Sequence, residues 1–187
     1  MIEKEIKKLL SIASYRDLLT IFAWQEVIQQ VNHYYLDSDC VLYQKNISVR
    51  IREKDNILKL QVKKPLSIQD GIHIKEEYSE VITSIPSQMS VSKISEITEL
   101  LLSSVELIGS LRTQRHIYSY DLDTTIYLDQ NNYLGHVDYE LEIEYEHDYP
   151  TALVEYLQER NIVIGETSLG KYRRFVKKYL EQKLHPN

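Results

Sequence analysis

Apolar and polar residues alternate along much of the chain with a period of two, which is typical of β-strands. At the N-terminus, Ile2 and Ile6 fall on one parity, and Glu3, Glu5 and Lys7 fall on the other. Similar alternation or strand-type composition predicts further strands at 32–36, 47–53, 57–64, 72–82, 107–120, 124–130 and 136–146. Pro65 lacks a backbone N–H, so we expect it to end the strand at 57–64.

Helical spacing of apolar residues appears in other parts of the chain. After Ser14, a candidate N-cap, the spacing predicts an amphipathic helix over about 15–31. A helical or mixed segment is expected at 87–104, a helix at 150–159 following Pro150, and a helix at 171–183. The two strand-rich blocks are each followed by helical sequence, and we interpret residues 1–187 as a single α+β domain.

The composition of the chain limits the classes of protein to which it can belong. The 187 residues are 43% hydrophobic and 27% charged, as in globular proteins, and the net charge of −6 argues against a general nucleic-acid binder. The single cysteine, Cys40, allows no intramolecular disulfide. No run approaches the ~20 apolar residues of a membrane span, and charges interrupt any signal peptide. We expect a cytoplasmic protein without a membrane partner, either monomer or homodimer.

Charge is sorted among the predicted strands, and this feature points to chemistry. Arg50 and Arg52 share one strand face, and Lys59 and Lys63 share the next; Asp138, Glu140, Glu142 and Glu144 stand in one row. A half-buried sheet with a solvated face also explains alternation, but such faces usually mix signs. Clustered carboxylates suit a divalent cation, and guanidinium forks suit phosphate oxygens. A closed sheet with a polar interior, holding a polyphosphate and a metal, accounts for both the cationic strands and the carboxylate strand.

Several motifs occur in an order that resembles the CYTH superfamily, the triphosphate tunnel metalloenzymes. Glu3-Lys4-Glu5-Ile6-Lys7 resembles the family's first-strand Glu-x-Glu-x-Lys motif. The other matching segments are Val49-Arg50-Ile51-Arg52, Leu60 to Pro65, Arg115, Leu128-Asp129, Asp138 to Glu142, and Gly170 to Phe175. Thr113 stands where the family often has a lysine. The resemblance implies an eight-stranded antiparallel barrel that forms a tunnel with a charged interior and is flanked by helices.

The resemblance and the charge pattern together assign roles for triphosphate hydrolysis with Mg²⁺ or Mn²⁺. The expected catalytic residues are Glu5, Lys7 and Lys63. Expected triphosphate contacts are Arg50, Arg52, Lys59, Lys63, Arg115, Lys171 and Arg174. Expected metal ligands are Glu3, Glu5, Asp129, Asp138, Glu140 and Glu142. His73 and Glu77 are expected to face inward.

Three functions remain open from the sequence. The first is a triphosphatase that acts on inorganic tripolyphosphate or on an organic triphosphate such as thiamine triphosphate. The second is a class IV-type adenylate cyclase, and the third is a non-catalytic polyphosphate-binding module. In each case the expected partner is a small-molecule triphosphate and not a nucleic acid.

Overall fold

The computed structural model describes residues 2–69, 72–164 and 169–185, and eight strands within them close into one antiparallel barrel. The strands are β1 (Ile2–Leu10), β2 (Glu26–Leu36), β3 (Ser48–Lys54), β4 (Ile57–Gln69), β5 (Ile72–Ile82), β6 (Glu106–Ser119), β7 (Thr124–Tyr133) and β8 (His136–Tyr145). Their order around the barrel is β1-β5-β4-β3-β2-β6-β7-β8. β1 pairs with both β5 and β8 and so closes the sheet. The predicted α+β fold with an eight-stranded barrel is confirmed.

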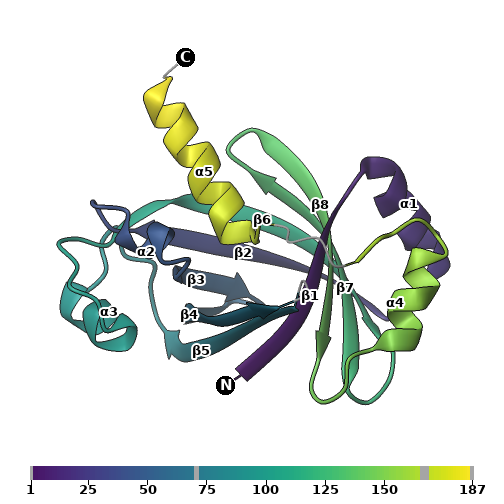
Figure 1. Cartoon of the computed structure of the whole chain (residues 1–187). Helices are drawn as coiled ribbons and strands as arrows, with labels where there is room; N and C mark the ends of the chain where they lie inside the picture. Colours follow the sequence, from purple (N-terminus) through teal and green to yellow (C-terminus); the bar gives the residue numbers. More distant parts are fainter. Residues whose placement is uncertain (1, 70–71, 165–168, 186–187) are drawn as a thin grey trace.

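Within the described residues, five helices flank the barrel (Figure 1). They are α1 (Ile12–Ile21), α2 (Val41–Gln44), α3 (Val91–Thr98), α4 (Thr151–Gln158) and α5 (Lys171–Leu184). No helix in the described part of the chain has the length and apolar character needed to cross a membrane.

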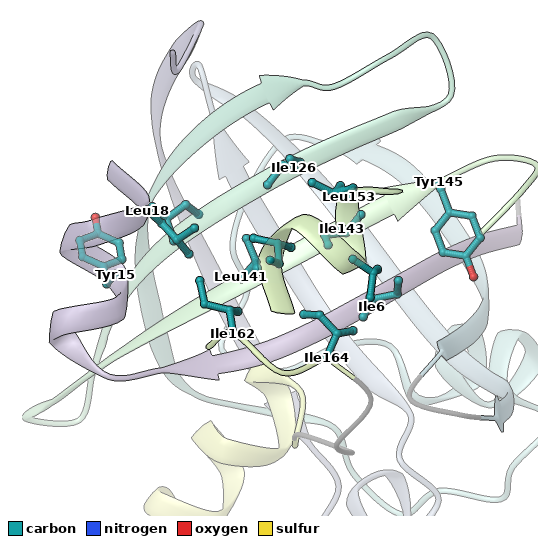
Figure 2. Close-up of a cluster of buried hydrophobic side chains, with 13 residues drawn as sticks. Ile6, Tyr15, Leu18, Ile126, Leu141, Ile143, Tyr145, Leu153, Ile162 and Ile164 are labelled. Atoms are coloured by element: carbon teal, nitrogen blue, oxygen red, sulfur yellow. The ribbon is translucent and has the colours of Figure 1, made fainter. Parts of the chain in front are cut away.

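The apolar parity of the strands faces outward, where helices cover it. Figure 2 shows one such cluster, in which Leu18 of α1 and Leu153 of α4 lie over Ile126, Leu141 and Ile143 of β7 and β8. A second cluster buries apolar residues of β2, β3 and β4 under α2 and α3. Because the outer face carries these contacts, the polar parity of each strand is left for the barrel interior.

Helix α5, yellow in Figure 1, packs against one end of the barrel interior. Its Tyr172 and Phe175 are buried in one cluster with Tyr34 of β2 and Leu111 of β6. Tyr34 and Leu111 both lie on the faces of their strands that point into the barrel. Gly109 of β6 makes this close approach possible, because a Cβ at that position would lie 3.1 Å from the Phe175 ring. Gly109 also has a φ of +137°, which side chains rarely adopt.

Two local predictions are wrong. The helix expected over 15–31 is α1, which begins after its N-cap Ser11 and ends at Ile21; residues from Glu26 onward form β2 and pair along β6. Long-range pairing outweighs the local spacing that favoured a helix. Pro65 does not end its strand either. β4 continues to Gln69 through a register shift between Pro65 and Ser67, and such an irregularity accommodates a residue that has no N–H.

Candidate active site

A cavity of about 430 Å³ lies inside the barrel and is lined mainly by charged side chains. Eight of the described lining residues are cationic and four are carboxylates, although the whole chain carries a net charge of −6. The cations are Lys7, Arg50, Arg52, Lys63, Lys75, Arg115, Lys171 and Arg173, and the carboxylates are Glu5, Glu77, Glu142 and Glu144. The cavity therefore concentrates positive charge in an acidic protein, which favours an anionic ligand.

One wall of the cavity carries a carboxylate cluster built by β1 and β8. Glu5 pairs with Glu144 in the strand register, and Lys7 pairs with Glu142. Carboxylate oxygens of Glu5, Glu142 and Glu144 lie within 4.8 Å of one another. Three convergent carboxylates that face a cavity fit the all-oxygen coordination of Mg²⁺ or Mn²⁺.

Lysines keep Glu5 of this cluster ionised. The Lys7 Nζ lies 2.8 Å from Glu5 Oε2 and 2.6 Å from Glu142 Oε1, and Lys75 also contacts Glu5. Burial alone would raise the pKa of Glu5, but Lys7 and Lys75 outweigh it and hold that pKa far below its usual range. The Glu5 carboxylate is therefore charged at neutral pH, as a metal ligand must be.

A second group of carboxylates lies deeper, behind the cavity lining. Asp129 and Glu140 are fully buried, and neither lines the cavity. Arg115 forms a two-pronged interaction with Asp129, with Nε 2.8 Å from Oδ1 and Nη2 2.6 Å from Oδ2. The Lys171 Nζ lies 2.8 Å from Asp129 Oδ2 and 2.9 Å from Glu142 Oε1, and it also contacts Glu140.

Two residues expected in the site pair with each other outside the cavity lining. Arg174 holds Asp138 through Nε–Oδ2 at 2.8 Å and holds Glu140 through Nη1–Oε1 at 2.9 Å. Tyr133 and Asn131 also donate hydrogen bonds to Asp138. Its oxygens are thus engaged by the barrel and by α5.

The opposite wall carries arginines whose charge is not neutralised. Arg50 Nε donates to Gln61 Oε1 at 3.0 Å, and Arg52 Nε donates to Asn32 Oδ1 at 3.1 Å. Neither guanidinium forms an ion pair with a carboxylate in the described part of the chain. Burial, followed by repulsion from Arg50 and then Arg115, lowers the pKa of Arg52 to about 9. These two arginines present positive charge to the cavity without a direct ion pair to any described carboxylate.

The remaining expected residues divide between the cavity and its surroundings. Lys63 lines the cavity, with its Nζ 3.0 Å from Glu77 Oε2, and Glu77 also accepts a hydrogen bond from Gln61 at 2.6 Å. Lys59 is exposed and is not among the cavity-lining residues; it pairs with Arg52, two residue pairs further along the β3–β4 ladder than Arg50 and Gln61. The side chains of Glu3 and His73 lie outside the described residues.

Some cavity residues were missed as site residues. Glu144 completes the carboxylate cluster, and Lys75 reaches Glu5 from β5. Parity was a sufficient signal for both, because Glu144 continues the row of Glu142 and Lys75 shares the face of Glu77. Tyr127, whose ring lies 4.2 Å from the Arg115 guanidinium carbon, gave no comparable signal.

The barrel and its cavity define a class of protein: a closed antiparallel barrel whose charged interior sets arginines opposite clustered carboxylates. The profile of the CYTH domain matches residues 1–176, and the chain belongs to the CYTH family.

Three relatives extend this comparison. "Putative triphosphatase YjbK" of Bacillus subtilis is 27% identical over 182 residues, covering 93% of this chain and 94% of the relative. The crystal structure of a protein from Bacillus halodurans described as a "putative adenylate cyclase" is 28% identical with a TM-score of 0.70, covering 91% of this chain and 95% of that one. HpAC1 from Hippeastrum, reported to have a dominant triphosphatase activity, has a TM-score of 0.72 at 23% identity, covering 94% and 95%.

Proposed function

We propose that the protein is a triphosphatase that uses Mg²⁺ or Mn²⁺ to release phosphate from a small-molecule triphosphate, acting as one CYTH-type unit over residues 1–187. One observation carries the proposal: among the described residues, Arg50 and Arg52 form no ion pair with a carboxylate, and they line the cavity that also holds the Glu5, Glu142 and Glu144 cluster. A triphosphate bound with a divalent ion supplies the negative charge that the arginines need and the positive charge that the carboxylates need. The relationship to the Bacillus subtilis protein supports the same activity.

Each wall of the cavity has its own task in this reaction. Arg50 and Arg52 bind phosphate oxygens as forked donors, and Lys63 adds a further positive charge from β4. Arg115 is held in one orientation by Asp129, so its guanidinium is preorganised for charge that develops on the transferred group. When bound, the divalent ion neutralises phosphate charge and polarises the bond that breaks.

The carboxylates of the site hold the divalent ion and steady the lysines. Glu5 and Glu142, which would hold the ion, flank the Lys7 ammonium, so Lys7 would stabilise negative charge on a leaving oxygen of the bound triphosphate. Glu144 completes the ligand set from the next position of β8 on the same face. Because hydrolysis of a phosphoanhydride requires mainly positioning and charge stabilisation, this set of residues is sufficient for it.

The test is phosphate release from tripolyphosphate, thiamine triphosphate and ATP with Mg²⁺ or Mn²⁺, using Glu144→Gln beside Glu146→Gln. Glu146 is an exposed glutamate just beyond the end of β8, so its variant controls for the loss of one negative charge. We expect E144Q to lose metal-dependent phosphate release and E146Q to keep it. Equal activity in both variants would exclude the proposed metal site.

The relationship to the Bacillus halodurans protein makes adenylate cyclase activity the second candidate. A cyclase that acts on ATP releases pyrophosphate and cyclic AMP, whereas a triphosphatase releases orthophosphate. Product analysis with ATP in the same assay therefore separates the two activities. Tight binding of tripolyphosphate without any product would instead identify a non-catalytic binding protein.

A further inference from the structure

Helix α5 begins with a basic first turn, which is unfavourable for an isolated helix. Lys171, Arg173 and Arg174 occupy this turn, and no acidic residue accompanies them. The N-terminal end of a helix already carries partial positive charge from its free N–H groups, so cations placed there are destabilising. Partners from elsewhere in the chain must therefore offset this charge.

Buried carboxylates of β7 and β8 supply these partners. The Lys171 Nζ lies among three of them, 2.8 Å from Asp129, 2.9 Å from Glu142, and in contact with Glu140. Three residues further along the helix, Arg174 contacts the other oxygen of Glu140. The carboxylates thus match the charge of the helix end, and Lys171 is itself almost fully buried.

The three carboxylates around Lys171 have the arrangement of a cation site. Oxygens of Asp129, Glu140 and Glu142 lie within 4.8 Å of one another, as do those of the cluster formed by Glu5, Glu142 and Glu144. The two clusters differ in access, because Glu5 and Glu144 line the cavity whereas Asp129 and Glu140 do not. A metal ion in the deeper cluster would have to displace the Lys171 ammonium from three carboxylates at once, which is strongly unfavourable.

We propose that Lys171 is the built-in cation of the Asp129, Glu140 and Glu142 cluster, so that this cluster docks α5 and the cavity takes one divalent ion and not two. The number of ions rests on the proposed function, whereas the docking role does not. Lys171 is then a positioning residue that fixes the Glu142 carboxylate within the cavity cluster. Asp129 and Glu140 act on the helix and on Arg115, not as metal ligands.

The experiment is crystallography with Mn²⁺ and imidotriphosphate, a hydrolysis-resistant tripolyphosphate analogue, using anomalous scattering to locate the ions. The wild-type protein is expected to show one manganese peak, at Glu5, Glu142 and Glu144, and E144Q is expected to lose it. Lys171→Met is expected to gain a peak at Asp129 and Glu140. A wild-type manganese peak at Asp129 and Glu140 would overturn the inference even where E144Q confirms the proposed function.

Thermal unfolding without metal tests the docking role separately. Glu140→Gln removes a charged partner from the buried Lys171 and the half-buried Arg174, whereas Glu144→Gln changes a half-buried position at the cavity. We expect E140Q to unfold several degrees below E144Q. Wild-type stability of E140Q would refute the docking role, and absence of any manganese peak in the wild-type protein would refute the metal site of the proposed function.

Discussion

Arg52 offers the sharpest test of the idea that the cavity is built for an anion, because its charge is costly when no anion is bound. The pKa of Arg52 is lowered from 12.5 to about 9, first by burial and then by Arg50 and Arg115. Between about pH 9 and pH 12.5, Arg52 therefore keeps its proton in the unfolded chain and tends to lose it in the folded one. At neutral pH, where Arg52 is charged in both states, the charge therefore destabilises the fold.

The substitution Arg52→Gln removes this charge. One pKa unit corresponds to about 1.4 kcal/mol, so a drop of this size amounts to a few kcal/mol. Loss of the hydrogen bond to Asn32 offsets about 1 kcal/mol of it. We expect the free energy of unfolding of unliganded R52Q to rise by about 1–3 kcal/mol, which raises Tm by roughly 2–10 °C in a chain of this size.

The same substitution weakens binding of the anion. A hydrogen bond that involves a charged group contributes about 1.5–3 kcal/mol, so we expect the Kd for tripolyphosphate to rise roughly 10- to 100-fold. Calorimetric melting with and without tripolyphosphate measures both effects. Arg112→Gln is the matched control, because Arg112 is exposed and lies on the other parity of β6 from Arg115. An R52Q protein that melts below the wild type and binds tripolyphosphate equally well would refute this reasoning.

Three further predictions concern stability. Gly109→Ala should lower the free energy of unfolding by about 1–3 kcal/mol in denaturant titrations. The loss should exceed that of Gly135→Ala, whose added Cβ meets no atom within 4 Å, and equal losses would contradict the role of the close approach to α5. Neighbouring cations hold the pKa values of Glu142 and Asp138 below their usual range. The stability that these carboxylates contribute should therefore persist from pH 7 to 5 and be lost as the pH falls below about 4. A plot of Tm against pH measures this loss. Tyr35→Phe loses a 2.6 Å hydrogen bond to a backbone carbonyl and should lower the free energy of unfolding by about 1 kcal/mol while phosphate release is unchanged, since Tyr35 packs outside the cavity.

The barrel walls could be predicted from the sequence because strand parity is a local property. A strand that is buried against helices on one face and lines a charged cavity on the other must alternate, as β3 does at Val49 to Arg52. The segment at 26–31 lacked this signal, since Val27 and Ile28 are adjacent apolar residues that also fit a helical stripe. In the structure Val27 is exposed, and the segment is a strand because of its pairing with β6.

The site was only partly predictable because some contacts depend on the relative placement of distant elements. Parity placed Glu140 and Glu142 on one face of β8, and this is correct. It could not tell which of them would meet a helix that begins 31 residues after Glu140. That contact depends on how α5 crosses the end of the barrel, which the pattern of β8 does not encode.

The row of carboxylates on β8 therefore has two roles, docking of α5 and formation of the cavity cluster, and Glu142 takes part in both. Asp138 and Glu140 are held by α5, whereas Glu144 belongs to the cavity cluster. Both Lys7 and Lys171 contact Glu142 Oε1, and Arg115 contacts Glu142 Oε2. A charge at this position stabilises the docked helix and also contributes to the proposed metal site, so Glu142→Gln should lower both Tm and metal affinity. Glu140→Gln should lower Tm with metal affinity retained, and Glu144→Gln should lower metal affinity with little loss of Tm; any other ordering of the three variants would show that the row is not divided in this way.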